Sequence, residues 1–182
     1  MLLEKNVKHY KELESTQKLA REKIEELENG TVILADRQTL GYGTKERKWY
    51  TGDGNNIAMT IVIKPNCTIK SLSTLTIDIA ASIQRAIYTL YGYSLKIKEP
   101  NDLLLNNKKI CGILTQVTTR KEQVQSLLIG IGFNVNETIF DSDTKILATS
   151  LKKEYQKEFS REEIIKQILK EIELQLKSNY IL

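Results

Sequence analysis

Residues 98–114, K-E-P-N-D-L-L-L-N-N-K-K-I-C-G-I-L, hold two short apolar runs separated by turn residues. Leu103–Leu105 reads as one strand, and a second strand begins near Lys109. Between them, Asn106-Asn107 suits a tight turn because asparagine tolerates a positive φ. Pro100 biases the chain just before it toward an extended conformation. The stretch therefore predicts a β-hairpin.

Polar side chains gather at the ends of this hairpin. They are Lys98, Asn101, Asp102, Lys108 and Lys109. A solvated turn with exposed lysines is the commoner explanation of such a set. Gly112 favours a binding site instead, because a glycine inside an apolar strand weakens it and often marks the close approach of a ligand.

The rest of the chain alternates helical and strand patterns. Strands are expected at 5–14, 31–36, 57–64, 93–98, 110–119 and 124–136, and helices at 15–30, 72–90 and 160–176. The first helix is expected to stop at Gly30, and the last begins with a Ser160–Glu163 capping box. Helix, clustered strands, then helix predicts an α+β fold, a mixed β-sheet with helices mainly on one face.

The bulk composition excludes several classes of protein. The chain has 182 residues, which suits one domain over 1–182, and its formal net charge of +4 is mild. Its two cysteines argue against a disulfide framework and favour a reducing compartment. The start lacks a signal-peptide core, and no apolar run approaches the roughly 20 residues that span a bilayer. A cytoplasmic protein without a membrane partner is expected.

A long polar stretch at 37–56 contains four glycines. Gly41 and Gly43 free the backbone for close approach to a ligand. Three cationic side chains follow them, Lys45, Arg47 and Lys48. Backbone N–H groups beside cations suit a phosphate or a carboxylate, although a surface loop has the same composition. Trp49, the single tryptophan, is equally often a packing anchor.

The sequence gives less support to a hydrolase, a metal site or a nucleic-acid-binding protein than to a site for an anionic ligand. The chain has one histidine, His9, which argues against a histidine-rich metal centre and leaves little for a catalytic triad. Ser15 and Thr16 would also serve as ordinary helix N-caps. Residues 36–49 carry four basic side chains against two acidic ones, a net charge of only +2. We therefore expect no nucleic-acid partner. Binding to DNA that depends steeply on salt concentration would contradict this expectation.

The order and spacing of the motifs are more specific than any one of them. S-T-Q at 15–17, A-D-R-Q-T-L-G-Y-G at 35–43, K-E-P-N-D…K-K-I-C-G-I-L at 98–114, G-I-G-F-N-V-N at 130–136 and A-T-S-L at 148–151 occur in one chain. This arrangement resembles the biotin protein ligase family, and the resemblance runs from about Ser15 to Ile172. It implies a biotin/lipoate protein ligase catalytic-domain-like fold.

The resemblance also implies a reaction, its cofactors and its site. Such ligases make biotinyl-5′-adenylate from biotin and ATP with Mg²⁺, and then biotinylate one lysine of a biotin carboxyl carrier protein. Carried over by position, the biotin pocket would comprise Ser15, Thr16, Gln17 and Gln38. The loop over the adenylate would comprise Gly41, Tyr42, Gly43, Thr44, Arg47 and Trp49. Lys109 and Arg47 would be catalytic, and Gly112 would lie close to the ligand. Asn101 and Asp102 would sit by the phosphates and the metal, and Asn134 near the adenine.

The sequence departs from the family pattern in three respects. The loop usually reads G-R-G-R-x-G-R, but Tyr42 and Thr44 replace two arginines and Glu46 replaces a glycine, so weaker retention of the adenylate is expected. Glu99 stands where tryptophan is usual. Neither an N-terminal winged-helix domain nor a C-terminal SH3-like domain is expected within 1–182.

Two questions stay open at this point. The related lipoate ligases and octanoyl transferases share the fold, and in the transferases a cysteine is acylated, which makes Cys111 the residue to watch. A small buried strand residue is the commoner role for such a cysteine. The resemblance also admits a homodimer paired through the sheet.

Overall fold

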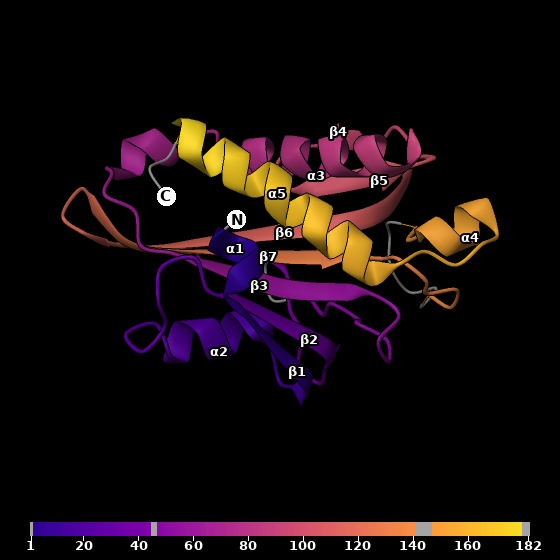
Figure 1. The fold of residues 1–182 in the computed structure, drawn as a ribbon, viewed down its shortest axis with the longest axis horizontal. Helices are drawn as coiled ribbons and strands as arrows, with labels where there is room; N and C mark the ends of the chain where they lie inside the picture. The colour runs from indigo at the N-terminus through magenta and orange to yellow at the C-terminus, as the bar shows by residue number, and fades with distance from the viewer. Residues whose placement is uncertain (1, 45–46, 141–146, 180–182) are drawn as a thin grey trace.

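The structure, a computed structural model, describes residues 2–44, 47–140 and 147–179. Its centre is a mixed sheet whose strands are β1 (Val7–Leu13), β2 (Val32–Gln38), β3 (Ile57–Ile63), β4 (Lys96–Lys98), β5 (Asp102–Leu105), β6 (Lys108–Arg120) and β7 (Gln123–Phe133). The strand order is β1-β2-β3-β7-β6-β5-β4 (Figure 1). Only β1 and β2 pair in parallel, and the remaining neighbours are antiparallel.

The helices are divided unequally between the two faces of the sheet. They are α1 (Leu2–Lys5), α2 (Thr16–Glu22), α3 (Leu75–Tyr91), α4 (Leu151–Tyr155) and α5 (Arg161–Asn179), with a short 3-10 turn at Ile69–Leu72. The long helices α3 and α5 lie together over one face, and α2 lies on the other side against β2, β3 and β7 (Figure 1). The predicted α+β fold, with helices mainly on one face, is confirmed. No helix within the described ranges has the length and apolar composition to cross a bilayer.

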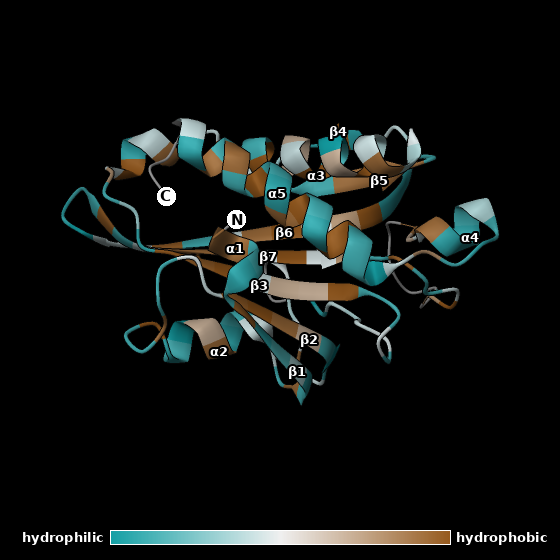
Figure 2. Ribbon diagram, in the orientation of Figure 1, coloured by the Kyte–Doolittle hydropathy of each residue, from teal (hydrophilic) through white to brown (hydrophobic). Residues whose placement is uncertain are grey.

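The main core lies beneath α3 and α5. Alternate strand residues such as Ile61 and Phe133 pack there against Ile83 and Ile168, all fully buried. A smaller cluster beneath α2 includes Ala20 and Val62. Figure 2 shows β3 and most of β2 in hydrophobic colours and the edge strand β1 in hydrophilic ones. Since α2 has only seven residues, it leaves part of its face of the sheet uncovered.

The hairpin predicted from residues 98–114 is present. β5 and β6 are joined by Asn106 and Asn107, whose φ values of 51° and 62° lie in the left-handed region that asparagine tolerates. In the register of this pair, Asp102 lies opposite Gly112. The turn residues therefore set which side chains of the two strands share a face.

One helix prediction needs correction, and two short helices were not predicted. The helix expected over 15–30 ends at Glu22, because the chain then continues as turns in which Glu26 and Leu27 N–H groups both bond to Lys23 O. Leu27 still packs in the smaller cluster. The apolar spacing therefore predicted the burial of Leu27 correctly, but it predicted too long a helix. The short helices α1 and α4 had no predicted counterpart.

Candidate active site

The polar side chains of the predicted pocket cluster where α2 begins. Ser15 caps α2, and its hydroxyl accepts a hydrogen bond from Lys18 N–H at 3.4 Å. Gln38 Oε1 at the end of β2 accepts from both the backbone N–H of Thr16 at 2.7 Å and its hydroxyl at 3.1 Å. Because a helix start and a strand end converge here, the consecutive residues Ser15, Thr16 and Gln17 meet Gln38, which is distant from them in sequence.

Residues from the sheet complete this pocket. The Thr60 hydroxyl on β3 lies 2.9 Å from Thr16 Oγ1 and 2.9 Å from Gln17 Oε1. The amide nitrogen of Gln17 donates to Gln116 Oε1 on β6 at 3.1 Å. Thr16, Gln17 and Thr60 are buried, and Gln116 is partly buried. These neutral donors and acceptors can exchange partners with a neutral polar ligand at little electrostatic cost.

The glycine-rich loop folds back on itself beside the pocket. Gly43 N–H donates to Arg47 O at 2.8 Å, and Trp49 N–H donates to Gly41 O at 2.8 Å. A side chain at Gly41 would not fit, since its Cβ would lie 2.6 Å from Trp49 O. These two backbone hydrogen bonds hold the loop so that the Trp49 indole lies on the face of the sheet that α2 leaves uncovered.

Two glycines on neighbouring strands form the floor beneath that indole. Gly112 on β6 and Gly132 on β7 are paired in register. A Cβ on Gly132 would lie 2.2 Å from Trp49 Cε2, and a Cβ on Gly112 would lie 3.0 Å from Trp49 Cζ3. Gly130 lies two residues before Gly132 on β7. A Cβ on Gly130 would lie 2.6 Å from Gln17 Oε1. The group that approaches Gly112 in this structure is a tryptophan ring, and the predicted approach of a ligand stays a prediction.

Lys109 lies at the edge of the glycine floor. Its Nζ pairs with Asp102 Oδ1 at 2.7 Å, and both side chains are largely shielded from solvent. The same ammonium lies 5.5 Å from the centroid of the Trp49 ring, a cation–π arrangement. The structure thus places a cation on a strand beside the glycine floor.

The two predicted asparagines make structural contacts. The Asn101 side chain donates to Ile113 O at 3.0 Å, which fastens the start of β5 to β6. Asn134 is buried, and its side-chain amide donates to Thr149 O at 3.0 Å. Both lie next to the strands that carry the site, and their predicted contacts with a nucleotide stay predictions.

The residues on either side of the loop tip are open to solvent. Thr44 and Arg47 are exposed, and Lys45 lies outside the described residues. Two polar atoms of the loop, Tyr42 Oη and Trp49 Nε1, are buried without a hydrogen-bond partner in the described part of the chain. Buried polar groups in folded proteins are almost always satisfied, so these two donors are exceptions.

Four residues of the site did not emerge from the sequence. They are Thr60, Gln116, Gly130 and Gly132. The two glycines did carry a signal, because their spacing of two places them on one face of an apolar strand where a side chain would normally pack. The polar pair carried none, since a lone Thr or Gln in a strand is ordinary.

The alternative chemical centres are disfavoured by their surroundings. Cys111 is fully buried, and burial raises the pKa of its thiol, which suppresses the thiolate that a nucleophile needs. His9 on β1 contacts Asp36 Oδ1 at 3.0 Å, and Arg161 contacts the same oxygen at 3.0 Å. Burial opposes ionisation of Asp36, but the hydrogen bonds from His9 and Arg161 keep its pKa below the ordinary value. No serine contact of His9 is present among the described residues, so this cluster ties β1 and β2 to α5.

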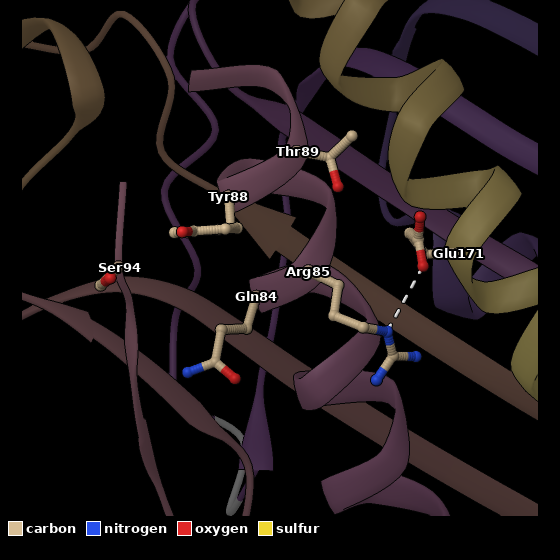
Figure 3. Close-up of a pocket in the computed structure, with 6 residues that line it drawn as sticks. All are labelled: Gln84, Arg85, Tyr88, Thr89, Ser94 and Glu171. Atoms are coloured by element: carbon tan, nitrogen blue, oxygen red, sulfur yellow. Dashed lines mark hydrogen bonds and ion pairs between the residues drawn. The ribbon is translucent and has the colours of Figure 1, made fainter. Parts of the chain in front are cut away.

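A surface hollow of about 480 Å³ lies elsewhere, against α3 and α5 (Figure 3). Arg85 and Glu171, which line it, already form a pair with an N–O distance of 3.3 Å. None of the predicted site residues lines it, so it is not the candidate site.

The carboxylates near the site suit a Mg²⁺ ion that is also bound to the phosphates of a nucleotide. Within residues 2–44, 47–140 and 147–179, no three His, Cys, Asp or Glu side chains gather as a metal cluster. Mg²⁺ commonly takes one or two carboxylates and fills its remaining positions with phosphate and water. Asp102, on the floor beside Lys109, suits that role.

Comparison with known proteins decides the family. A model of the "Biotin/lipoate A/B protein ligase family" matches residues 10–134, which is more than half of the chain. The chain belongs to this family. The bifunctional ligase/repressor BirA of Bacillus subtilis is 38% identical over 144 residues, covering 78% of this chain and 44% of that protein. A biotin–[acetyl-CoA-carboxylase] ligase of Paracoccus denitrificans is 34% identical over 105 residues, covering 57% of this chain and 43% of that protein. The chain thus spans less than half the length of these curated relatives.

Solved structures of the family agree with the fold. The biotin protein ligase of Aquifex aeolicus in complex with biotin and ATP superimposes with a TM-score of 0.83 at 29% identity, covering 96% of this chain and 71% of that one. A ligase-like protein of unknown function from Silicibacter superimposes with a TM-score of 0.72 at 13% identity, which shows that the fold extends beyond characterised ligases. The fold is therefore that of the biotin protein ligase catalytic domain, and the activity has to be argued from the site.

Proposed function

We propose that this protein activates biotin with ATP, forming biotinyl-5′-adenylate and pyrophosphate, and then transfers the biotinyl group to a lysine of a biotin carboxyl carrier protein. The observation that supports this most directly is Lys109, an ammonium held beside a glycine floor that is continuous with a neutral polar pocket. A neutral pocket suits the ureido ring of biotin, and a cation at its end suits the carboxylate and the α-phosphate.

The first step brings two anions together. A carboxylate oxygen of biotin attacks the α-phosphorus of ATP, the bond to the β-phosphate oxygen breaks, and pyrophosphate leaves. Negative charge accumulates on the phosphoryl oxygens in the transition state. Lys109, held by Asp102 and by its strand, supplies compensating charge without reorganising. Mg²⁺ bound with the ATP phosphates would neutralise further charge, with Asp102 as its protein contact.

Positioning contributes as much as charge. The uncovered face offers Gly112 and Gly132, over which a flat group can lie against the backbone. The indole of Trp49 now lies there, and its unpaired Nε1 can donate to a ligand oxygen. The pocket residues would hold the biotin ring while Lys109 orients the reacting ends, which turns a bimolecular reaction into one within a single complex.

The second step needs no side-chain nucleophile from this chain. The amine of the carrier lysine attacks the acyl carbon of the adenylate, AMP leaves, and the amine loses a proton as the amide forms. The raised pKa of the buried Cys111 thiol supports this direct route over transfer through an acyl-cysteine.

Isotope exchange between pyrophosphate and ATP tests the proposal. We expect exchange that depends on biotin and does not occur with lipoate or octanoate. Exchange with lipoate in place of biotin would move the protein to the lipoate ligases, and no exchange with any of these acids would contradict the activation step. Labelling of a carrier domain with biotin and ATP then tests the transfer step separately.

A further inference from the structure

The carboxylate of Glu154 on α4 is the centre of a hydrogen-bond network outside the pocket. It accepts hydrogen bonds from Thr149 Oγ1 at 2.5 Å, from Asn106 Nδ2 at 2.6 Å and from Lys108 Nζ at 2.9 Å. Its side chain is only 10% exposed. Burial opposes its ionisation, but the three donors lower its pKa to about 2, so it is a carboxylate at any physiological pH.

Two of these donors belong to segments that flank Lys109. The backbone N–H of Lys109 donates to Leu147 O at 2.8 Å, and the N–H of Thr149 donates to Lys109 O at 2.9 Å. The segment 147–149 therefore pairs with both backbone groups of Lys109. Asn106 sits in the turn that starts the strand on which Lys109 lies.

Neighbouring residues of a strand point to opposite faces, which separates the two lysines of the hairpin. Lys109 faces Asp102 and Trp49, whereas Lys108 is held by Glu154. Glu154 thus holds the Lys108 ammonium away from the site. Through segment 147–149 it also fixes the backbone from which the Lys109 side chain extends.

The helix that carries Glu154 is itself anchored. Tyr155, the next residue, stacks on Tyr93 with ring centroids 3.7 Å apart and an interplanar angle of 8°. Ser150 caps α4 by accepting from Lys153 N–H at 3.0 Å. The carboxylate is therefore presented from a fixed position.

We propose that Glu154 is a positioning residue for Lys109, acting through the Thr149 hydroxyl and the backbone of segment 147–149. The expected effect on the reaction rate rests on the proposed function. The expected effect on the backbone of Lys109 does not. Misplacing a positioned reacting group by about 1 Å can cost about a hundredfold in rate, so a partial loss of aim should lower the rate of adenylate formation by about tenfold.

A double-mutant cycle tests the proposed path. Glu154→Gln, Thr149→Val and the double variant are compared in biotin-dependent pyrophosphate exchange, and kcat and KM are measured separately. We expect each single variant to lower kcat by about tenfold with KM for biotin within about twofold, because the pocket at α2 is untouched. The double variant should be no worse than either single one, since both remove the same link. Thr149→Val also tests the path by itself if Glu154→Gln does not fold.

Two controls separate positioning from general stability. Glu158→Gln breaks an exposed pair with Lys152 and should leave kcat unchanged. Lys108→Met removes one donor but keeps the Thr149 link, so kcat should stay within about twofold of wild type, as expected for a partly exposed pair. Additive losses in the double variant, or a loss confined to KM, would overturn the proposal.

Amide hydrogen exchange gives a readout that does not depend on activity. In Glu154→Gln we expect lower protection of the Lys109 and Thr149 amides, with the amides of β7 unchanged. Unchanged protection of Lys109 would contradict the inference even if the enzyme were active. If the wild-type protein shows no exchange of pyrophosphate, the proposed function fails, and the amide measurement still decides whether Glu154 fixes the backbone of Lys109.

Discussion

The glycine floor predicts that one added methyl group will displace the Trp49 indole. In Gly132→Ala the new Cβ would lie 2.2 Å from Cε2 and 2.4 Å from Cζ2 of the ring. Carbon atoms pack at about 3.5–4.0 Å, so the ring has to move by roughly 1.5 Å. Gly132 does not have a positive φ, and alanine therefore adds this clash without backbone strain.

The cost follows from the same geometry. Overpacking a well-packed site costs about 1–3 kcal/mol, and about 1.4 kcal/mol corresponds to tenfold in an equilibrium. Because Trp49 is half-buried on a loop, releasing the indole is easier than deforming the sheet. The docked loop should therefore become roughly tenfold less populated, with little loss of global stability and a slower adenylate-forming step.

Fluorescence provides the assay because Trp49 is the single tryptophan of the chain. We expect the emission maximum to move to longer wavelength in Gly132→Ala, and by less in Gly112→Ala, where the nearest ring atom would be 3.0 Å away. Gly43→Ala is the matched control for emission, since among the described residues its Cβ would meet only Arg47 O, at 3.9 Å. Unchanged emission from a folded Gly132→Ala variant would refute the placement of the indole on this floor.

Three further predictions concern single side chains. Lys109→Ala should leave the fold intact and lower adenylate formation more than tenfold in pyrophosphate exchange; a smaller loss, under about 1.4 kcal/mol, would exclude a central electrostatic role. Thr44→Arg should reduce labelling of bystander proteins by escaped adenylate, because a charged hydrogen bond contributes about 1.5–3 kcal/mol, and equal, negligible labelling by both proteins would contradict this. The folded-state pKa of Glu154 is lowered to about 2, so its stabilising contribution is present above the ordinary carboxyl pKa and is lost as pH falls toward 2. Urea unfolding should accordingly show wild type losing about 2–3 kcal/mol more than Glu154→Gln between pH 5 and pH 2, and parallel pH profiles would rule this out.

Local patterns in the sequence determined the hairpin, the long helices and the start of α2, whereas the pocket residues were named only through the family resemblance. Asn106-Asn107 predicts its turn because a positive φ is a property of the residues themselves. Helix α5 follows from its capping residue Ser160, whose hydroxyl accepts from Glu163 N–H at 3.3 Å, and from its apolar spacing. The predicted start of α2 at Ser15 holds for the same reason, since a cap acts within one turn of its helix.

Only the tertiary structure decided which distant residues share the site. Gly112 and Gly132 become a floor because β6 and β7 pair in one register, and a shift of either strand by one residue would turn its glycine to the other face. Thr60 joins the pocket because β3 lies beside β7, a neighbour far along the chain. The link from Glu154 to the backbone of Lys109 depends on α4 docking against the hairpin. Such contacts form where long-range packing brings strands and helices together, and no local pattern of side chains encodes that pairing.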